Sequence, residues 1–257
     1  MAKKIKNRGH SQELKAMLKQ AVAEAAKQLI DLKTDTRTTT WNQAHRQFGS
    51  NPDKYLPAHY ALLKRVQKTE AQIPFINKTV TIMNYNSIKA VMPVGGDDLL
   101  QAGGSLELRY GDGSEIFTPV GNPESTEHPD PGEIIYVVES GEVMCRRWNC
   151  QNGLKTRITV DTQSIVMNID VLVEDNEARS VVTRDRVARM LEEFCQAEII
   201  TTLLSPNQPS YQFDIRQFIF MDCPDMHWSY WLRIALVFTE THRFGGVVGI
   251  SKKGWLG

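Results

Sequence analysis

Residues 132–148 of this 257-residue chain read GEIIYVVESGEVMCRRW, and this stretch predicts two neighbouring β-strands. The run from Ile134 to Val138 is rich in β-branched and aromatic residues, which favour strands. Ser140-Gly141 interrupts the run with turn residues, and Glu142 to Trp148 follows as a second strand. We therefore expect a sheet in the middle of the chain.

Further strands are expected on both sides of this pair. Leu106, Leu108 and Tyr110 alternate with other residues before Gly111-Asp-Gly113 breaks the run. The apolar residues 165–169 predict a buried strand. Residues 121–132 are rich in Gly, Pro, Glu and Asp, so we expect an exposed loop there.

Helices are predicted at the N-terminal end of the chain. Ser11 is a typical N-cap residue, and a helical spacing of three and four follows it. The apolar positions with this spacing are Leu14, Leu18, Val22, Ala25 and Leu29. Shorter helices are expected around residues 41–48 and from Pro57 to Val66, since proline suits the first helical turn. Residues 79–90 fit either a helix or a strand, and residues 184–199 fit a helix.

This order of elements predicts a mixed α/β (α+β) fold: helices at the N-terminus, central strands that form a sheet with a pocket, and a closing C-terminal helix. Residues 205–209, SPNQP, look like a linker. We therefore expect one domain over residues 1–204 and an aromatic-rich appendage over residues 205–257. The apolar run 230–238 in this appendage requires a partner surface, either the main domain or a second subunit in a homo-oligomer.

Composition places the chain among globular proteins, because 41% of its residues are hydrophobic. No apolar run reaches the roughly 18 residues that a membrane span requires. The first residues, MAKKIKNR, are basic but lack the apolar stretch of a signal peptide. We therefore expect a cytoplasmic location and no membrane partner.

The net charge is zero, but the charges are unevenly distributed. Residues 1–70 contain 14 Lys and Arg against 6 Asp and Glu, whereas residues 71–210 contain 11 against 20. A basic N-terminal third indicates a face for a polyanion such as RNA. The alternative is that two oppositely charged parts of one fold attract each other.

The motif Pro93-Val-Gly-Gly-Asp-Asp98 is the first candidate for a functional loop. Two adjacent glycines permit either a structural turn or a close approach of a ligand to the backbone. The motif is neither a phosphate loop nor a dinucleotide fingerprint, because GK[ST] and GxGxxG are absent.

The motif Cys145-Arg-Arg-Trp-Asn-Cys150 is the second candidate. In a strand, Arg146 and Arg147 would point to opposite sides, so that one of them grips a carboxylate or phosphate in a pocket. The alternative is an exposed edge strand with both arginines solvated. Trp148 is expected in the core rather than stacked on a base.

Nucleophilic and metal chemistry find little support in the sequence. The four cysteines form no CxxC pair and no zinc-ligand spacing, so we expect buried, reduced thiols. No signature supports Cys145 as a nucleophile paired with a histidine. Asp222, Asp225 and His227 match no common ligand spacing. We therefore expect no metal and no cofactor.

A series of short motifs runs in one order along residues 5–200. They are Asn7-Arg8, Ser11-Gln-Glu-Leu14, Trp41-Asn-Gln-Ala-His-Arg46, Asn51-Pro-Asp-Lys-Tyr55-Leu-Pro57, Ala61-Leu-Leu-Lys-Arg65, Ile76-Asn77, Asn84, Ser87, Pro93-Val-Gly-Gly96, Asp98, Leu106-Glu-Leu-Arg109, Phe117-Thr-Pro119, Gly121, Pro131-Gly-Glu133-Ile-Ile-Tyr136, Cys145-Arg-Arg-Trp-Asn149 and Thr156. In this order they resemble the tRNA-binding and editing module of the bacterial phenylalanyl-tRNA synthetase β subunit, its third and fourth B domains. Many genomes also carry this module as a free-standing protein.

The resemblance implies a pocket that, in the synthetase, hydrolyses tyrosine mischarged on phenylalanine tRNA. It implies catalysis by a positioned water, helped by the terminal ribose of the tRNA, without a strong base. The positions implied for catalysis are Gly95, Gly96, Thr118, Glu133 and Asn149. The positions implied for contacts to substrate or tRNA are Asn84, Ser87, Asp98, Pro119, Gly121, Arg146 and Arg147. Lys15 and Lys19 of the first helix are expected to contact the tRNA backbone.

Three departures from the family pattern alter the implied pocket. Gly95 stands where the synthetase commonly has a histidine. Free-standing relatives usually have tyrosine at the position of Asp97 and aspartate at the position of Thr81. Tyrosine specificity is therefore not carried over. The anticodon-binding and catalytic domains of the synthetase are absent, so we expect no aminoacylation activity.

The resemblance thus implies an aminoacyl-tRNA hydrolase that acts in trans on mischarged tRNA. One alternative is a module that binds tRNA or an amino acid without catalysis, because fold does not fix function. Another is a protein-interaction adaptor that acts through residues 205–257.

Overall fold

The computed structural model describes residues 1–28, 30–68, 72–172, 177–205, 208–214 and 231–236. The chain divides into two units, each of which is described on its own. Unit 1 contains Met1–Asp98 and Ile158–Thr201, and unit 2 contains Leu99–Arg157 and the described part of Thr202–Gly257. Helices and strands are mixed along the chain, which confirms the predicted fold class.

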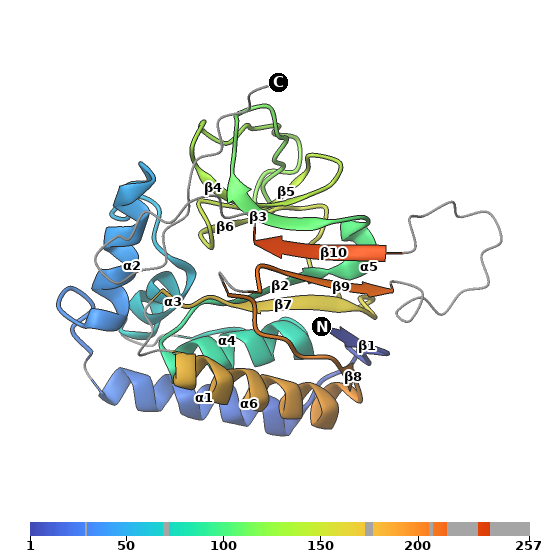
Figure 1. The fold of residues 1–257 in the computed structure, drawn as a ribbon. Helices are drawn as coiled ribbons and strands as arrows, with labels where there is room; N and C mark the ends of the chain where they lie inside the picture. The colour runs from blue at the N-terminus through green and yellow to red at the C-terminus, as the bar shows by residue number, and fades with distance from the viewer. Residues whose placement is uncertain (29, 69–71, 173–176, 206–207, 215–230, 237–257) are drawn as a thin grey trace. The chain divides into compact units, whose positions relative to one another are not determined.

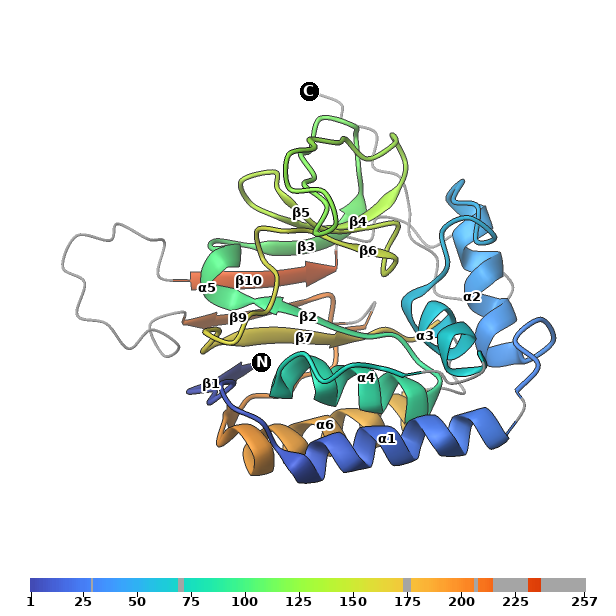
Figure 2. The ribbon, with the colours of Figure 1, turned by 180° about the vertical axis from the view of Figure 1, so that it is seen from behind.

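Unit 1 is a four-stranded antiparallel sheet with helices. Its elements are β1 (Ala2–Lys3), α1 (Gln12–Lys27), α2 (Thr36–Gln47), α3 (Ala58–Val66), α4 (Lys78–Ala90), β2 (Val94–Asp98), β7 (Ile165–Ile169), α6 (Glu177–Cys195) and β8 (Glu198–Ile199). The strand order is β2-β7-β1-β8. Helices α1, α4 and α6 lie together on one face of this sheet (Figures 1 and 2).

The helices of unit 1 begin at side chains that cap them. The Ser11 hydroxyl accepts a hydrogen bond from the Leu14 N–H at 3.1 Å, as predicted for α1. Asn77 caps α4 in the same way, accepting from the Val80 N–H at 2.9 Å. Residues 79–90 are therefore helical, because capping and burial of one face outweigh the strand preference of β-branched residues.

The core of unit 1 joins the three helices to the sheet. Leu14, Ile82 and Ile165 come from α1, α4 and β7, and all three side chains are fully buried. Full burial of such a side chain stabilises a fold by roughly 1.5–3 kcal/mol. Val94 of β2 and Val187 of α6 belong to the same cluster. The face of β2 that carries Val94 is thus the face that packs against the helices.

Unit 2 is a six-stranded sheet with long loops. Its elements are α5 (Leu99–Ala102), β3 (Leu106–Tyr110), β4 (Ile134–Val138), β5 (Val143–Arg146), β6 (Gln151–Asn152), β9 (Ser210–Asp214) and β10 (Trp231–Leu236), and the strand order is β6-β5-β4-β3-β10-β9. Strands β4 and β5 are the pair predicted from residues 132–148. Phe117, Ile135, Val137 and Val143 form the buried cluster over them.

Two strands of unit 2 belong to the predicted appendage. β10 pairs in parallel with β3, with Ile234 opposite Leu106, and β9 pairs antiparallel with β10. The division of the chain at residue 204 and the packing of the apolar side chains of the tail stay predictions. Trp228 and Trp255 lie outside the described residues.

Buried aromatic rings join α2 to α3. His59 is fully buried, and its Nε2 lies 3.0 Å from the backbone carbonyl oxygen of Arg37. The rings of Trp41 and His59 meet edge to face, with centroids 5.8 Å apart. Burial lowers the pKa of His59 from 6.5 to about 4, and the hydrogen bond with the Arg37 carbonyl opposes this shift only in part. His59 is therefore neutral at pH 7.

The His59 imidazole predicts a loss of stability in mild acid. Because its folded pKa lies below its unfolded value, the unfolded chain takes up a proton first as the pH falls from 6.5 towards 4. Between pH 7 and pH 5 this linkage should remove about 2 kcal/mol of unfolding free energy. Urea unfolding of the wild type and of His59→Phe at both pH values measures it. His59→Phe should lose about 2 kcal/mol less than the wild type, and the exposed control His10→Gln should behave as the wild type. Equal losses in wild type and His59→Phe would contradict this assignment.

Candidate functional site

Gly95 and Gly96 lie within strand β2, where they pair with Asn168 and Met167 of β7. The interpretation of these glycines as a turn is therefore wrong. Their small size serves a close approach of two strands: a Cβ on Gly96 would lie 2.8 Å from the Val166 carbonyl oxygen. Only glycine fits at that position without moving the backbone.

The two glycines present their backbone groups in opposite directions. The Asp170 N–H donates to the Pro93 carbonyl at 3.2 Å, so these two residues form a hydrogen-bonded pair of the ladder. Opposite pairs alternate along an antiparallel ladder. Gly95 therefore directs its N–H towards β7, whereas Gly96 directs its N–H away from β7, at the end of the strand order. Gly96 is thus the better candidate for a backbone donor.

Gly95 belongs to the face of the sheet that lies opposite the helices. Neighbours along a strand point to opposite faces, and Val94 packs into the core with the helices. Gly95 and its partner Asn168 therefore share the other face. A Cβ on Gly95 would lie 3.1 Å from Asn168 Oδ1. The Asn168 amide thus lies beside the position that a side chain at residue 95 would take.

Ser87 and Asp98 hold the two ends of β2. The Ser87 hydroxyl donates to the Met92 carbonyl at 2.7 Å and so fixes the connection from α4 into the strand. Asp98 is buried at the other end, where its Oδ2 accepts from the Thr162 hydroxyl at 2.7 Å. Asn84 is half-buried on α4. Ser87 and Asp98 thus hold the strand in place, and their implied contacts to substrate or tRNA stay predictions.

Lys15 and Lys19 are exposed one turn apart on α1. Residues four apart lie on the same side of a helix. The salt bridges of the described residues include neither lysine. This side of α1 therefore carries positive charge that is open to a polyanion.

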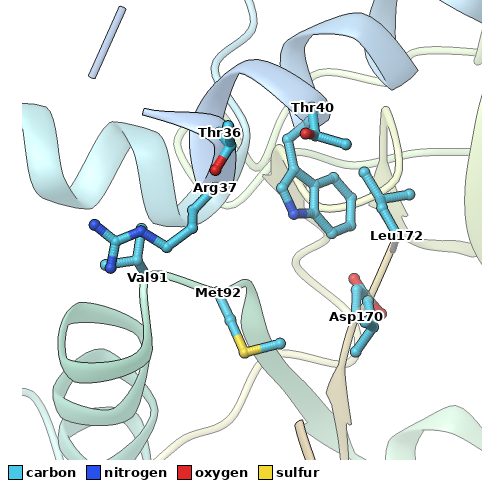
Figure 3. A pocket seen from close by; sticks show the side chains of 9 residues that line it. Thr36, Arg37, Thr40, Val91, Met92, Asp170 and Leu172 are labelled. Carbon is cyan, nitrogen blue, oxygen red and sulfur yellow. The ribbon is translucent and has the colours of Figure 1, made fainter. Parts of the chain in front are cut away.

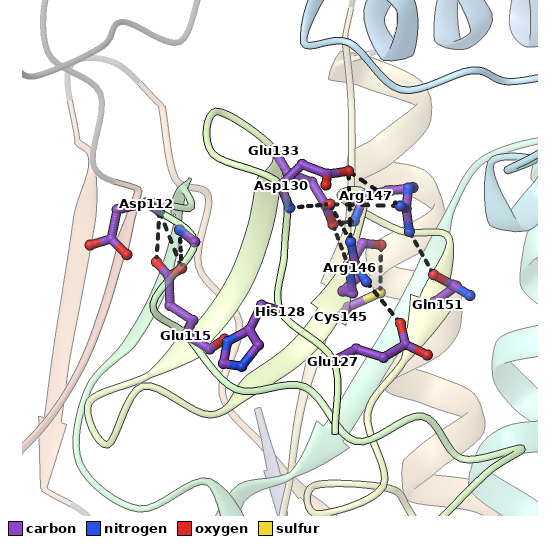
Figure 4. A network of polar contacts seen from close by, with 11 residues as sticks. Asp112, Glu115, Glu127, His128, Asp130, Glu133, Cys145, Arg146, Arg147 and Gln151 are labelled. Atoms are coloured by element: carbon purple, nitrogen blue, oxygen red, sulfur yellow. Dashed lines mark hydrogen bonds and ion pairs between the residues drawn. The ribbon is translucent and has the colours of Figure 1, made fainter. Parts of the chain in front are cut away.

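The strongest polar cluster of unit 2 is built on Glu133, which is buried beside the start of β4 (Figure 4). Its Oε1 accepts from Arg146 Nε at 3.0 Å and from the Arg147 N–H at 2.8 Å. Its Oε2 accepts from Arg146 Nη2 at 2.8 Å and from the Asp130 N–H at 3.1 Å. Two donors reach each oxygen, which is about the full capacity of a carboxylate.

These donors set the charge of Glu133. Burial alone would raise its pKa, but the hydrogen bonds and charge of Arg146, with the two backbone N–H groups, lower the pKa below 4.5. The carboxylate is therefore ionised at neutral pH. The stability that it adds is present above its unfolded pKa and is lost as the pH falls through the folded value. These contacts are those of a positioning residue, and the catalytic role implied for Glu133 by the resemblance stays a prediction.

Both arginines of the second motif are buried, so the interpretation as solvated edge residues is wrong. Arg146 Nη1 donates to Glu127 Oε2 at 2.8 Å, and its guanidinium lies 5.8 Å from the centre of the Phe117 ring. Arg147 donates to Gln151 Oε1 at 2.9 Å. Strand β5 ends at Arg146, and Arg147 has a φ of 48°. The expected alternation of the two arginines is therefore wrong as well.

The other predicted positions of unit 2 lie on the turns around this cluster. Asn149 is buried, and its N–H donates to the Arg147 carbonyl at 2.9 Å. The Thr118 carbonyl accepts from the Leu154 N–H at 2.8 Å, and Pro119 forms a bridge with Gly153. Gly121 is exposed in the loop that follows. Trp148 is buried, as predicted.

The predicted catalytic residues are divided between the two units. Gly95 and Gly96 belong to unit 1, and Thr118, Glu133 and Asn149 belong to unit 2. Their convergence in one cavity stays a prediction.

Sequence reasoning missed three residues around these positions. Asn168 lies beside Gly95 because β2 and β7 pair, although the two residues are 73 positions apart in the chain. Glu127 and Asp130 contact the arginines from residues 121–132, which we expected to be an exposed loop. The acidic residues of that loop were the only available signal.

The hypotheses of a cysteine nucleophile, a metal site and a membrane span were also compared with the structure. Cys145, the cysteine considered as a nucleophile, is buried. Burial raises the pKa of the neighbouring Cys150 thiol to about 11, which makes Cys150 a poor nucleophile at neutral pH. Within the described ranges, no three His, Cys, Asp or Glu side chains are grouped so that they could hold a metal. Asp222, Asp225 and His227 lie outside those ranges. No described helix combines the length and apolar character needed to cross a bilayer.

A comparison with protein families gives one match. The family model of the B3/4 domain matches residues 40–201, more than half of the chain. This domain is found in the phenylalanyl-tRNA synthetase β subunit. No curated protein matches the chain.

The Glu133 cluster predicts a large effect of a small substitution. Glu133→Gln removes the negative charge and leaves the buried Arg146 guanidinium without its main partner. Loss of one member of a buried ion pair costs about 3–5 kcal/mol. Glu127→Gln is the matched control, because it removes the half-exposed partner of the same arginine and should cost less than about 1 kcal/mol. Urea unfolding at pH 7 measures both. Equal costs for the two variants would show that Glu133 does not organise this cluster.

Proposed function

The chain belongs to the B3/4 domain family, and we propose that it hydrolyses the ester bond of mischarged aminoacyl-tRNA in trans. The family match over residues 40–201 carries this proposal, since the same domain is found in the phenylalanyl-tRNA synthetase β subunit and links the chain to tRNA. The motifs that resemble the editing module of that subunit support the more specific proposal, which is ester hydrolysis.

The backbone of β2 supports the chemistry. Hydrolysis of an ester places negative charge on the carbonyl oxygen in the transition state, and a fixed N–H donor stabilises that charge. The Gly96 N–H points away from β7 and is held at a fixed angle by the ladder on either side. We assign the oxyanion contact to Gly96, and we assign to Gly95 the space beside it.

The roles that we assign to the residues of unit 2 follow from the contacts that each side chain already makes. Arg146 is committed to Glu133 and Glu127 through three donors at 2.8–3.0 Å. Arg147 lies 3.6 Å from the exposed carboxylate of Asp130, and a phosphate of the terminal adenosine would take the place of that carboxylate. Thr118 and Asn149 would orient the water and the amino group. No strong base is required, because an aminoacyl ester is already activated and positioning supplies much of the barrier reduction.

Lys15 and Lys19 support tRNA as the substrate carrier. Exposed lysines on one side of a helix make phosphate contacts that do not depend on base sequence and that weaken as salt increases. Their positive charge lies in unit 1, the same unit that contains Gly96. This assignment implies that the protein binds its substrate through the phosphate backbone of the tRNA.

One observation favours a second candidate, a module that binds aminoacyl-tRNA without catalysis. The carboxylate of Glu133 accepts hydrogen bonds from four donors, so this buried carboxylate of the predicted site in unit 2 does not serve as a base. A fold that binds the substrate and lacks turnover would have the same contacts.

Deacylation of a panel of mischarged tRNAs tests the proposal. We expect release of the amino acid from at least one member of the panel to be faster than spontaneous hydrolysis, and to be proportional to protein concentration. Gel-shift binding of the same tRNAs is measured in parallel. Binding without acceleration would contradict hydrolysis and support the non-catalytic module. The absence of both binding and acceleration would favour the adaptor function.

Gly95→Ala tests the site in unit 1. Its new methyl would lie nearest to the Asn168 amide, at 3.1 Å, and a small shift of that side chain should retain the fold while the space for the ester is filled. Deacylation should fall a hundredfold or more, the scale of a lost oxyanion contact. The double variant Gly95→Ala/Asn168→Ala is the control for displacement of the amide. Full activity of Gly95→Ala at an unchanged melting temperature would show that no substrate approaches this glycine.

A further inference from the structure

An arginine on helix α6 reaches across to helix α4 in unit 1. Arg186 Nε donates a hydrogen bond to Asn86 Oδ1 at 2.6 Å, and this is its one hydrogen bond among the described residues. Asn86 is fully buried and carries no charge. A glutamine has an N–H donor as many bonds from the backbone as arginine Nε, and its amide is neutral. The contact between the two helices therefore does not require the positive charge of Arg186.

The charge of Arg186 is partly buried and is not offset by a carboxylate. Its Nη2 atom is buried without a hydrogen-bond partner. The Nη1 atom also has no partner among the described residues, but it is accessible to solvent. Burial lowers the pKa of the guanidinium, Tyr85 opposes this shift, and the charge of Arg189 adds to it. Arginine nevertheless stays protonated in proteins, so a cation without a counter-charge is kept at this position at a cost in free energy.

A second arginine, Arg189, lies beside the first. It is exposed three positions later on α6, and residues three apart are neighbours on a helix surface. Like charges in this arrangement destabilise a helix. Among the described residues, Arg189 has no ion-pair partner either. The fold thus gains nothing from this pair of charges, and an anion bound from outside would offset both.

The acidic side chains of the neighbouring helices do not offset the pair. Asp185 forms an ion pair with Arg184 at 2.7 Å, and Glu24 of α1 forms one with Lys89 of α4 at 2.8 Å. Helix α4 itself contains no acidic residue. The remaining acids of α1 and α6 are exposed and make no ion pair with a described residue; they are Glu13, Glu177, Glu192 and Glu193.

Other arginines of unit 1 do have a negative group beside them. Arg37 borders the small hollow drawn in Figure 3 and donates to Asp35 through Nε at 2.9 Å and through Nη2 at 2.6 Å. Arg179, two turns before Arg186 on α6, interacts electrostatically with the same two residues. Within the described part of α6, Arg186 and Arg189 are therefore the arginines whose charge no carboxylate compensates.

A phosphate group has the chemistry that this pair lacks. Its oxygens carry negative charge and accept hydrogen bonds, and the planar guanidinium fork binds them with two parallel N–H donors. Tyr85 of α4 is partly buried near Arg186, and its hydroxyl has no partner among the described residues. A tyrosine hydroxyl is an additional donor and is uncharged at neutral pH. Tyr85 therefore does not compete with an anion for the arginines.

We propose that Arg186 and Arg189 bind a phosphate group, and that the backbone of an RNA supplies it. Arg186 Nη1 and the Arg189 guanidinium hold the phosphate oxygens at the contact between α4 and α6. This is a contact on α6 in addition to Lys15 and Lys19 of α1. The RNA source rests on the tRNA binding of the proposed function, whereas the phosphate site does not rest on hydrolysis.

Binding of uncharged tRNA, followed by fluorescence anisotropy at several salt concentrations, tests the proposal. Arg186→Gln keeps a donor for Asn86 and removes the charge, and Arg189→Gln removes an exposed charge. Each variant should weaken binding at low salt by about threefold or more, and should reduce the slope of log affinity against log salt by about one, the value for one lost phosphate contact. Arg184→Gln is the matched control on the same helix, because Asp185 already compensates that arginine, and it should bind as the wild type.

Inorganic pyrophosphate, titrated in a calorimeter, identifies the source of the phosphate. Weaker tRNA binding by both variants supports an RNA backbone. Weaker pyrophosphate binding by both variants, with tRNA binding unchanged or absent, supports the phosphate site with a free phosphorylated compound as its ligand. Arg189→Gln serves alone if Arg186→Gln does not fold.

Three results would overturn the proposal: no binding of either probe by the wild type, wild-type binding of both probes by the folded variants, or an equal loss in Arg184→Gln. Uncharged tRNA and pyrophosphate contain no aminoacyl ester. A failure of the proposed hydrolysis is therefore distinguished from a failure of this site.

Discussion

The buried carboxylate of Glu133 is the group on which the architecture of unit 2 depends. A buried charge is tolerated only when it is paired and hydrogen-bonded, and Glu133 receives two donors on each oxygen. Two of these are backbone N–H groups, at Asp130 and Arg147. Arg147 and the following Trp148 both have positive φ values, 48° and 64°, which side-chain-bearing residues rarely adopt. The carboxylate thus stabilises a backbone turn that local sequence preferences would disfavour.

The same saturation limits the chemistry that this region performs. A carboxylate with a lowered pKa and no spare acceptor site is a poor proton acceptor for an attacking water. An aminoacyl ester does not require one, since its hydrolysis is accelerated by orientation of the water and by stabilisation of the oxyanion. The fixed backbone of β2, whose ends are held by Ser87 and Asp98, is suited to the second task. In this account both units contribute rigidity and neither contributes a strong base.

Much of the fold could be predicted from local sequence, and less of the site. The Ser11 cap, the helix over residues 58–66 and the strand pair after Gly132 follow from short-range preferences, and all are present. The turn alternative for the glycines of β2 is wrong, because Gly96 is required by the Val166 carbonyl, 70 residues away in the chain. The burial of Arg146 likewise depends on Glu133 and Glu127, and no periodicity of the arginine motif contains that information. Contacts between distant segments thus account for what the sequence alone could not show.

The ionisation of Glu133 is the most direct measure of this account. A titration of its side-chain carboxyl carbon by ¹³C NMR, assigned by comparison with Glu133→Gln, reports the pKa in the folded protein. We predict a midpoint clearly below the ordinary value of 4.5, unchanged when uncharged tRNA is added. A midpoint at or above 4.5 would contradict the account, because the carboxylate would then be free to take up a proton and would not hold Arg146 and the turn in the manner described.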